Sequence, residues 1–244
     1  MKSHIPNLFT ASNLLCGMLA LIFVFTDDII GATVAIGLAL LMDFLDGFVA
    51  RALGVSSPIG KELDSLADNI TFGAVPGFVM ARLIQESLGA EFIPTDWFDG
   101  TGGPWFLIGF LISVYSAIRL ARFNLDERQS DAFYGVPTPA NTALILSFWL
   151  ILEFKPDSFL AAGLGFSWVL IGLTLLSSWL LIADIRLIAL KFKTYDFASN
   201  KYRYLLVISS LILLVLLQYV AIPFIFLIYF LLSFLQERGL ESVH

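Results

Sequence analysis

The sequence contains little charge, and this shortage excludes an ordinary soluble domain. Charged residues make up 14% of its 244 residues, whereas 58% are hydrophobic and 23 residues are Phe. Soluble domains carry about 25% charged residues, so this chain has too few polar groups to cover a surface exposed to water. The composition therefore predicts a protein whose apolar side chains face lipid.

Basic residues, cysteine and histidine are also scarce. A net charge of -6 leaves no basic stripe for a phosphate backbone, which excludes nucleic acid as a partner. The single cysteine, Cys16, has no partner for an internal disulfide, and we interpret it as a small packing residue in an apolar run. His4 and His244 lie at the two ends of the chain. Any chemistry must therefore use carboxylates.

Long apolar segments predict an all-α fold, a polytopic bundle of membrane-spanning helices. A hydrocarbon core about 30 Å thick needs roughly 20 apolar residues in a helix. Segments that meet or approach this length are residues 8–26, 29–53, 63–87, 105–123, 140–154 and 159–183. Within the third segment, Gly73 and Gly77 are small residues at a spacing that is typical of helix packing.

The last apolar stretch, residues 205–235, is too long for one comfortable span and short for two. Gln218 and Pro223 near its middle favour a break, which predicts a C-terminal hydrophobic hairpin of two short helices. The complete bundle then has about eight transmembrane helices, within a range of six to eight. We expect one membrane-embedded catalytic domain over residues 1–244.

The positions of lysine and arginine predict a cytoplasmic N-terminus. With eight spans, all of the 14 basic residues except Arg82 and Lys155 lie at or near the inner side. The helical spans favour a bacterial-type cytoplasmic (inner) membrane, and the lipid bilayer is the first expected partner.

Two aspartates lie inside the predicted span 29–53, near its cytoplasmic end. Asp43 and Asp46 stand at i and i+3, on one helix face with Gly47, Ala50 and Arg51. A charged side chain in a span costs a few kcal/mol or more, so such carboxylates are by default a functional hypothesis. The small residues leave a slot beside the carboxylates, and Arg51 supplies a cation for an anionic substrate group.

Asp64 and Asp68 open the next predicted span, at i and i+4. A turn predicted at residues 54–58 makes the two helices antiparallel neighbours, so each helix aims two carboxylates into a shared space. Oxygen ligands without His or Cys suit Mg²⁺ or Mn²⁺, and carboxylate-bound divalent ions clamp phosphate oxygens. These residues predict a metal-dependent phosphoryl-type transfer at the inner membrane surface. The alternative is that each carboxylate is a helix-end charge or pairs with a buried basic residue.

The segment 43–68 has the pattern D-x2-D-G-x2-A-R-x8-G-x3-D-x3-D, which includes Gly60. At every position it resembles the signature of the CDP-alcohol phosphotransferase family. The resemblance implies a dinuclear centre of two Mg²⁺ or Mn²⁺ ions, which binds the pyrophosphate of a CDP-linked lipid. The implied metal ligands are Asp43, Asp46, Asp64 and Asp68.

The same resemblance assigns roles to individual residues. Asp68 is the implied catalytic base, which deprotonates the incoming alcohol so that its hydroxyl displaces CMP. The implied contacts to the CDP-lipid are Gly47, Ala50, Arg51 and Gly60. The resemblance also implies a homodimer.

Two further stretches resemble the phosphatidylserine synthase branch of this family. They are IPNLFT at residues 5–10, with Asn13 and Gly17, and RLARFN at 119–124 followed by FYGVPTPA at 133–140. This branch transfers the phosphatidyl group of CDP-diacylglycerol to the hydroxyl of L-serine, which gives phosphatidylserine and CMP. We expect Asn7, Thr10 and Asn13 to bind the cytosine or ribose, whereas Asn7 after Pro6 is also consistent with a cap region.

Arg119 and Arg122 are the predicted serine-binding residues. They stand at i and i+3 near the inner end of the span 105–123, where they supply a fork or a positive pocket for the serine carboxylate. The alternative is that both are positive-inside anchors of that helix.

Other functions make different predictions. A sister enzyme that uses glycerol 3-phosphate or inositol phosphate shares the aspartate centre but needs cations for the acceptor phosphate. A transporter moves solute without releasing CMP. The transporter hypothesis also leaves the placement of Gly47, Ala50 and Arg51 unexplained. A purely structural membrane protein is indifferent to metal chelation.

Overall fold

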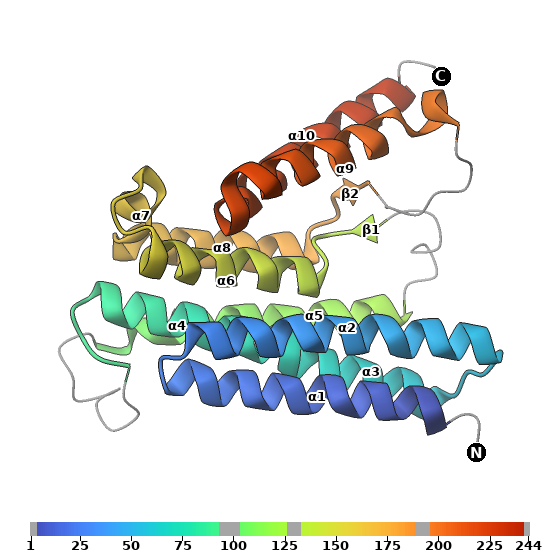
Figure 1. The fold of residues 1–244 in the computed structure, drawn as a ribbon, viewed down its shortest axis with the longest axis horizontal. Helices are drawn as coiled ribbons and strands as arrows, with labels where there is room; N and C mark the ends of the chain where they lie inside the picture. Colours follow the sequence, from blue (N-terminus) through green and yellow to red (C-terminus); the bar gives the residue numbers. More distant parts are fainter. Residues whose placement is uncertain (1–3, 93–102, 126–132, 189–195, 242–244) are drawn as a thin grey trace.

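Helices make up almost all of the structure, a computed structural model that describes residues 4–92, 103–125, 133–188 and 196–241 (Figure 1). The α-helices are α1 (His4–Phe25), α2 (Ile29–Leu53), α3 (Pro58–Asn69), α4 (Val75–Ser87), α5 (Leu111–Leu125), α6 (Thr138–Phe154), α7 (Phe159–Leu164), α8 (Ser167–Ile182), α9 (Phe197–Leu217) and α10 (Ala221–Glu241). Three tighter or wider helical segments join them: the π-helix η1 (Ile70–Ala74) and the 3₁₀-helices η3 (Gly103–Phe110) and η5 (Gln218–Val220).

The predicted helical membrane bundle is confirmed. Stretches long and apolar enough to cross a membrane are His4–Phe25, Ile29–Leu53, Gly103–Leu125 and Asn200–Arg238, and α6 and α8 are shorter apolar helices. Large apolar side chains such as Leu15, Val34 and Val215 are exposed on the outside of the bundle. A continuous apolar exterior of this kind is stable in lipid and not in water. The protein is therefore an integral membrane protein.

The structure also contains one small strand pair, which the all-α prediction did not include. The strands β1 (Phe133–Tyr134) and β2 (Arg186–Leu187) are antiparallel, with Phe133 opposite Leu187 and Tyr134 opposite Arg186. Each strand has two residues, so the pair joins the segment before α6 to the segment after α8 without forming a layer of its own.

The α2–α3 connection is built by local capping signals. Gly54 ends α2 in the left-handed conformation, at φ 62°, which glycine adopts without strain. The side chain of Ser57 accepts a hydrogen bond of 2.9 Å from the amide of Gly60, and Pro58 occupies the first turn of α3. The turn predicted at residues 54–58 is confirmed, so α2 and α3 run in opposite directions, and both helices pack against α1.

The predicted span 63–87 is a longer and irregular helix. It begins at Pro58, and the π-helix η1 separates α3 from α4. Hydroxyl groups of other helices bind the backbone of η1: Ser113 donates to the carbonyl of Gly73, at 3.0 Å, and Thr142 donates to that of Phe72, at 3.2 Å. These bonds satisfy carbonyl groups where the regular helical pattern is interrupted, directly after Asp68.

Small residues bring the helices into close contact around η1. A Cβ on Gly17 of α1 would lie 2.9 Å from the Cα of Thr71, and one on Gly109 would lie 2.7 Å from the Cα of Ala81. Cβ atoms added to Gly73 and Gly77 would likewise meet the side chains of α5 residues. The predicted packing role of Gly73 and Gly77 is confirmed, because only small residues allow this approach.

The predicted span 159–183 is wrong as a single helix. Gly165 ends the six-residue helix α7, and Phe166 has an extended backbone, at φ -89° and ψ 123°, before α8 begins. Ser158 caps α7 by accepting from the amide of Ala161, at 3.1 Å. The break shortens the apolar helix to residues 167–182.

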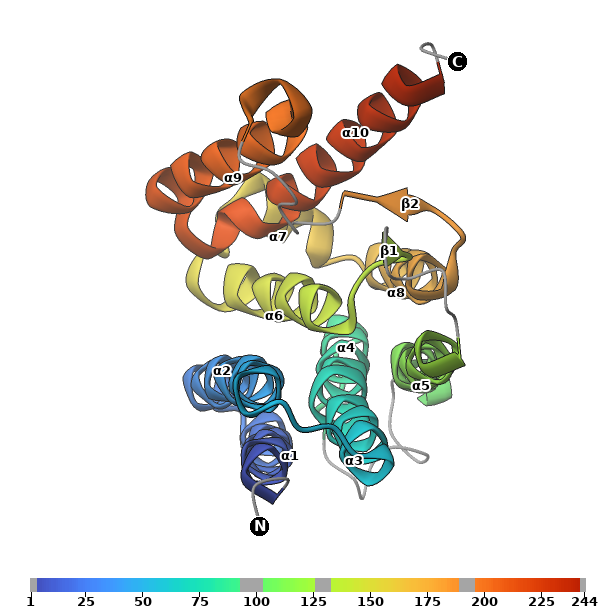
Figure 2. The same ribbon diagram turned by 90° about the vertical axis from the view of Figure 1, so that its right-hand side faces the viewer.

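The stretch 205–235 contains the break that Gln218 and Pro223 favoured. Gln218 has φ 53°, and η5 turns the chain between α9 and α10, each of which has 21 residues. Both helices extend beyond the predicted stretch. Figure 2 shows this hairpin stacked over α6 and α8.

Two side chains of α10 bind the backbone of Ile188, the residue that directly follows β2. The hydroxyl of Tyr229 donates to the carbonyl of Ile188, at 3.0 Å, and the hydroxyl of Ser233 accepts from the Ile188 amide, at 3.1 Å. Both polar groups of one backbone residue are thus satisfied from α10.

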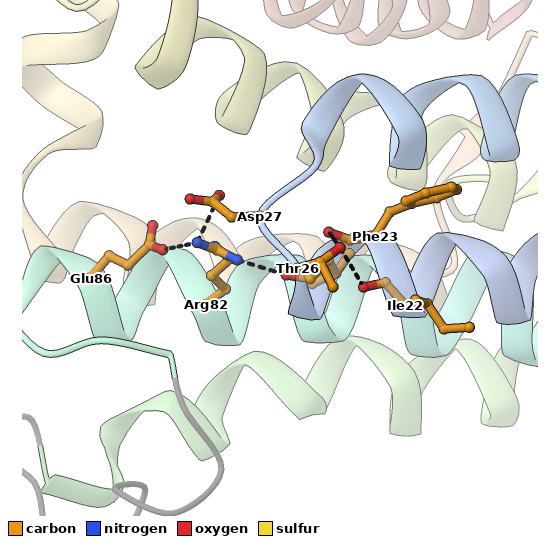
Figure 3. Close-up of polar contacts among 7 residues, drawn as sticks. Ile22, Phe23, Thr26, Asp27, Arg82 and Glu86 are labelled. Carbon is orange, nitrogen blue, oxygen red and sulfur yellow. Dashed lines mark hydrogen bonds and ion pairs between the residues drawn. The ribbon is translucent and has the colours of Figure 1, made fainter.

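A buried arginine connects the helices at the end of the bundle where α1 turns into α2 (Figure 3). Arg82 of α4 lies 2.7 Å from Asp27 in the α1–α2 turn and 2.6 Å from Glu86, and it donates to the carbonyl of Val24 at 2.7 Å. Its guanidinium also lies over the ring of Trp149, at 5.3 Å from the ring centre. The sequence predicted only that Arg82 leans outward; the structure makes it the connector of α1, α4 and α6.

Candidate metal and substrate site

Three of the four motif aspartates form one group. Asp43 comes from α2 and Asp64 and Asp68 come from α3, and one carboxylate oxygen of each lies within 4.8 Å of the others. All three side chains are partly buried. The connection between α2 and α3 produces this arrangement, because it reverses the chain so that Asp43 of α2 and the two aspartates of α3 face the same space.

Asp46 lies outside this group and is hydrogen-bonded to α1. Its residue is 7% exposed, and its Oδ2 accepts a hydrogen bond of 2.7 Å from the hydroxyl of Thr10. The structure therefore does not bring all four predicted metal ligands together. Asp46 lines an adjacent cavity together with Asp64, so Asp46 and the carboxylate group border the same space.

Asn13 touches the carboxylate group directly. Its side-chain amide donates to Oδ1 of Asp68 at 3.0 Å, and its residue is completely buried. Asn13 was predicted as a contact to the nucleotide, whereas in the structure its described partner is the predicted base. A hydrogen bond of this kind orients a carboxylate.

The donor set fits a divalent cation. Oδ1 of Asp64 is buried and has no hydrogen-bond partner among the described residues. The salt bridges of those residues do not involve Asp43, Asp64 or Asp68, so these carboxylates are not in direct ionic contact with a described cationic side chain. Oxygen ligands on clustered carboxylates suit a hard ion such as Mg²⁺ or Mn²⁺.

A cavity of about 320 Å³ lies beside the carboxylate group, between α1, α2 and α3. Its lining includes seven of the predicted site residues: Asn7, Thr10, Asp46, Gly47, Ala50, Gly60 and Asp64. Sites for small molecules enclose about 300–1,000 Å³, so this cavity is large enough for part of a nucleotide. Carboxylates border it on one side, where bound cations would face an anionic ligand.

Small residues shape the cavity and the surface next to it. A Cβ on Gly47 would lie 3.3 Å from Nη1 of Arg51, so the missing side chain lets the exposed Arg51 fold back along α2. A Cβ on Gly60 would lie 3.1 Å from Oδ1 of Asn7, which shows how closely α1 and α3 approach. Arg51 itself is not among the residues that line the cavity.

The two predicted serine-binding arginines lie in different surroundings. Arg119 is buried, and it lies within the range of charge interaction with Asp68 and Tyr229. Arg122 is exposed and donates to the carbonyl of Ile182 at the end of α8, at 3.3 Å. The structure places Arg119 toward the carboxylate group, and it does not join the two arginines in one fork.

Sequence reasoning missed several residues of the cavity. Ser56, Ser57 and Lys61 also line it. Lys61 donates to the carbonyl of Asn124 at 2.9 Å, which ties α3 to the end of α5. The capping pattern of Ser57 before Pro58 was a usable signal, since it places this hydroxyl at the start of the helix that carries Asp64.

Comparison with known proteins identifies the family. Residues 3–190 match the family model for CDP-alcohol phosphatidyltransferase, which covers the aspartate motif and the helices from α1 to α8. The hairpin of α9 and α10 lies beyond the matched residues.

Several curated relatives share this region. A CDP-diacylglycerol–serine O-phosphatidyltransferase of Helicobacter pylori is 34% identical over 58% of this chain, and the chain spans only 55% of that relative's length. The Bacillus subtilis protein of the same name is 32% identical over 60% of this chain and 76% of its own length. An archaetidylserine synthase of Methanothermobacter thermautotrophicus is 31% identical over 60% of this chain and 58% of its own. Because the family model matches more than half of the chain, the chain belongs to the CDP-alcohol phosphatidyltransferase family.

Proposed function

We propose that this protein transfers the phosphatidyl group of CDP-diacylglycerol to the hydroxyl of L-serine, which gives phosphatidylserine and CMP. The observation that carries the proposal is the group of Asp43, Asp64 and Asp68 beside a cavity lined by the small residues of the motif. The names of the relatives support serine as the acceptor.

The CDP head group would occupy the cavity between α1, α2 and α3. Thr10 holds Asp46 at its wall, and Asn7 and Gly60 line the same wall. The backbone atoms exposed at Gly47 and Ala50 leave space for the nucleotide, and Arg51 lies close enough to Gly47 to neutralise phosphate charge. The acyl chains would remain in the surrounding lipid, next to the exposed apolar faces of α1 and α2.

Asp43, Asp64 and Asp68 would hold divalent ions, with Asp46 as a further ligand from the cavity side. When bound, Mg²⁺ or Mn²⁺ supplies positive charge beside the pyrophosphate. We propose two ions, because four carboxylates border a space that would receive a ligand with two phosphates.

Asp68 would accept the proton of the serine hydroxyl as that oxygen attacks the phosphorus attached to diacylglycerol. The new bond joins the serine oxygen to this phosphorus, and the phosphorus–oxygen bond to CMP breaks. Its electron pair leaves with CMP. Asn13 orients Asp68 for this step through the hydrogen bond of 3.0 Å. Arg119, buried within the range of charge interaction with Asp68, would bind the serine carboxylate.

We propose that the site faces the cytoplasm, in a bacterial-type cytoplasmic membrane. The end of the bundle that carries the aspartates also carries Arg51, Lys61 and Arg122, whereas Arg82 lies at the opposite end (Figure 1). Basic residues concentrate on the cytoplasmic side of membrane proteins. We also propose a homodimer from the family resemblance, which cross-linking in native membranes would test.

The deciding experiment measures the reaction with purified protein in detergent. CDP-diacylglycerol and labelled L-serine are incubated with Mg²⁺ or Mn²⁺, and CMP release and labelled lipid are followed. Glycerol 3-phosphate and inositol 1-phosphate are the rival acceptors. Metal-dependent labelling by serine supports the proposal. CMP release with another acceptor only would keep the reaction class and overturn serine. If no acceptor releases CMP with either metal, the assignment as an enzyme is overturned.

A further inference from the structure

Three buried polar atoms near Asp68 have no hydrogen-bond partner among the residues that the structure describes. They are Oδ1 of Asn69, Oγ of Ser116 and Nε of Arg119. Ser116 is completely buried, and Arg119 is 8% exposed. Buried polar groups are nearly always paired in folded proteins, so unpaired ones point to a bound partner.

Gly73 brings two of these atoms to one place. A Cβ on Gly73 would lie 2.9 Å from Oδ1 of Asn69 and 3.6 Å from Oγ of Ser116, so both oxygens face the same point of η1. Ser116 and Arg119 stand at i and i+3 and share a face of α5. Asn69 directly follows Asp68, and Figure 2 shows α5 beside the column of α3 and α4.

The chemistry of the three atoms is complementary to an amino acid. The amide oxygen of Asn69 only accepts hydrogen bonds, which suits an ammonium group. The guanidinium of Arg119 only donates, which suits a carboxylate, and the hydroxyl of Ser116 donates on the same face. A phosphate group would find the acceptor Oδ1 of Asn69 and the neighbouring carboxylates on one side of it, which disfavours a phosphorylated acceptor.

We propose that Asn69 and Ser116 complete the acceptor subsite together with Arg119. In this subsite Asn69 accepts from the ammonium group of an α-amino acid, while Ser116 and Arg119 donate to its carboxylate. The inference rests on the proposed transfer to serine and deepens it, because it names the side chains that bind the ammonium and the carboxylate of serine. The subsite also lies near Asp68, because Arg119 is within the range of charge interaction with that carboxylate.

Two analogues of serine separate the two contacts. Ethanolamine keeps the hydroxyl and the ammonium but lacks the carboxylate, and 3-hydroxypropionate keeps the hydroxyl and the carboxylate but lacks the ammonium. CMP release from CDP-diacylglycerol is measured with each acceptor for the wild type, Asn69→Leu and Ser116→Ala. The quantity compared is the ratio of kcat/KM for serine to that for each analogue.

We expect Asn69→Leu to reduce the preference for serine over 3-hydroxypropionate by about tenfold or more, the usual effect of losing a hydrogen bond to a charged group. Its preference for serine over ethanolamine should stay within about twofold. Ser116→Ala should reduce the preference for serine over ethanolamine and leave the preference for serine over 3-hydroxypropionate within about twofold. KM for CDP-diacylglycerol should change little in both variants. Ser147→Ala is the matched control, because Ser147 is equally buried but donates to the carbonyl of Leu144 in its own helix.

The outcomes are distinct. Equal losses with all three acceptors would overturn the subsite, because a merely structural role lowers every rate together. If Asn69→Leu does not fold, Ser116→Ala removes one oxygen only and decides by its ratio for ethanolamine. A wild-type protein that releases no CMP with serine would instead overturn the proposed function on which the subsite rests.

Discussion

The side-chain amide of Asn13 donates a hydrogen bond of 3.0 Å to Oδ1 of Asp68, across 55 positions of the sequence. It joins the buried face of α1 to the last turn of α3, directly before the π-helix η1. One carboxylate oxygen is thereby fixed by the protein, and the other is left for an ion or for the proton of the acceptor.

Replacement of Asn13 by Leu removes this donor while keeping a side chain of similar size. We expect kcat for CMP release to fall about 10- to 100-fold, the usual effect of losing a residue that orients a metal-bound carboxylate. KM for CDP-diacylglycerol should remain close to the wild-type value, since Asn13 does not line the cavity.

Steady-state kinetics with Ser12→Ala supply the control. Ser12 is the adjacent residue of α1, and its hydroxyl donates to the carbonyl of Leu8 in its own helix. Its loss should leave kcat unchanged. An Asn13→Leu enzyme with wild-type kcat would show that Asp68 needs no help from α1.

Asp68→Asn should abolish turnover while leaving binding of the CDP-lipid measurable. The amide keeps the shape of the carboxylate but cannot accept the hydroxyl proton, and a positioned base contributes about 10²- to 10⁴-fold. Glu62→Gln, an exposed carboxylate on the same helix, should retain wild-type activity. Turnover above about a tenth of the wild-type rate would rule out Asp68 as the base.

The arrangement of Asp43, Asp64 and Asp68 was predictable because local signals determine it. The i, i+4 spacing fixes which aspartates share a face, and Gly54 and Pro58 determine where α2 ends and α3 begins. The prediction that Asp46 joins the same group used spacing alone. Its partner Thr10 lies 36 positions away, and only the packing of α1 against α2 shows which way the side chain turns.

Other features depend on partners that are remote in sequence. The π-helix η1 is stabilised by Ser113 and Thr142, which lie 40 and 70 positions from the carbonyls that they bind. Likewise, the oxygens of Asn69 and Ser116 that have no partner within the described part of the chain come from separate helices. Periodicity within one segment carries no information on such pairs, so sequence reasoning expected one regular span at residues 63–87.

Asp43→Asn should change stability in opposite directions with and without metal. In EDTA the variant should unfold at a temperature roughly 2–4 °C above the wild type, because removal of one charge relieves the repulsion among three carboxylates by about 1 kcal/mol. In Mn²⁺ the order should reverse, since an ion at about 100 times its Kd stabilises the intact site by about 2.7 kcal/mol. Thermal unfolding in detergent measures both. A Tm of the wild type that does not respond to Mn²⁺ or Mg²⁺ would contradict the metal site.

Arg82→Met should destabilise the fold without changing the chemistry. The substitution leaves the exposed carboxylates of Glu86 and Asp27 without their cation and removes the donor to the carbonyl of Val24, so we expect a loss of about 1–3 kcal/mol, mostly from the unpaired carbonyl. The double variant Arg82→Met/Glu86→Gln should recover part of this loss, because it removes one of the two carboxylates that have lost their cation. Lys155→Met, an exposed basic residue after α6, should unfold like the wild type.

The chemistry should survive because Arg82 and the aspartates lie at opposite ends of the bundle (Figure 1). At a temperature where the Arg82→Met variant is folded, its KM for CDP-diacylglycerol and its kcat should match those of the wild type. Loss of activity in fully folded protein would show that the two ends are coupled, through α4 and the π-helix that joins it to Asp68. Unchanged unfolding, by contrast, would mean that the cation contributes nothing net to the junction of α1, α4 and α6.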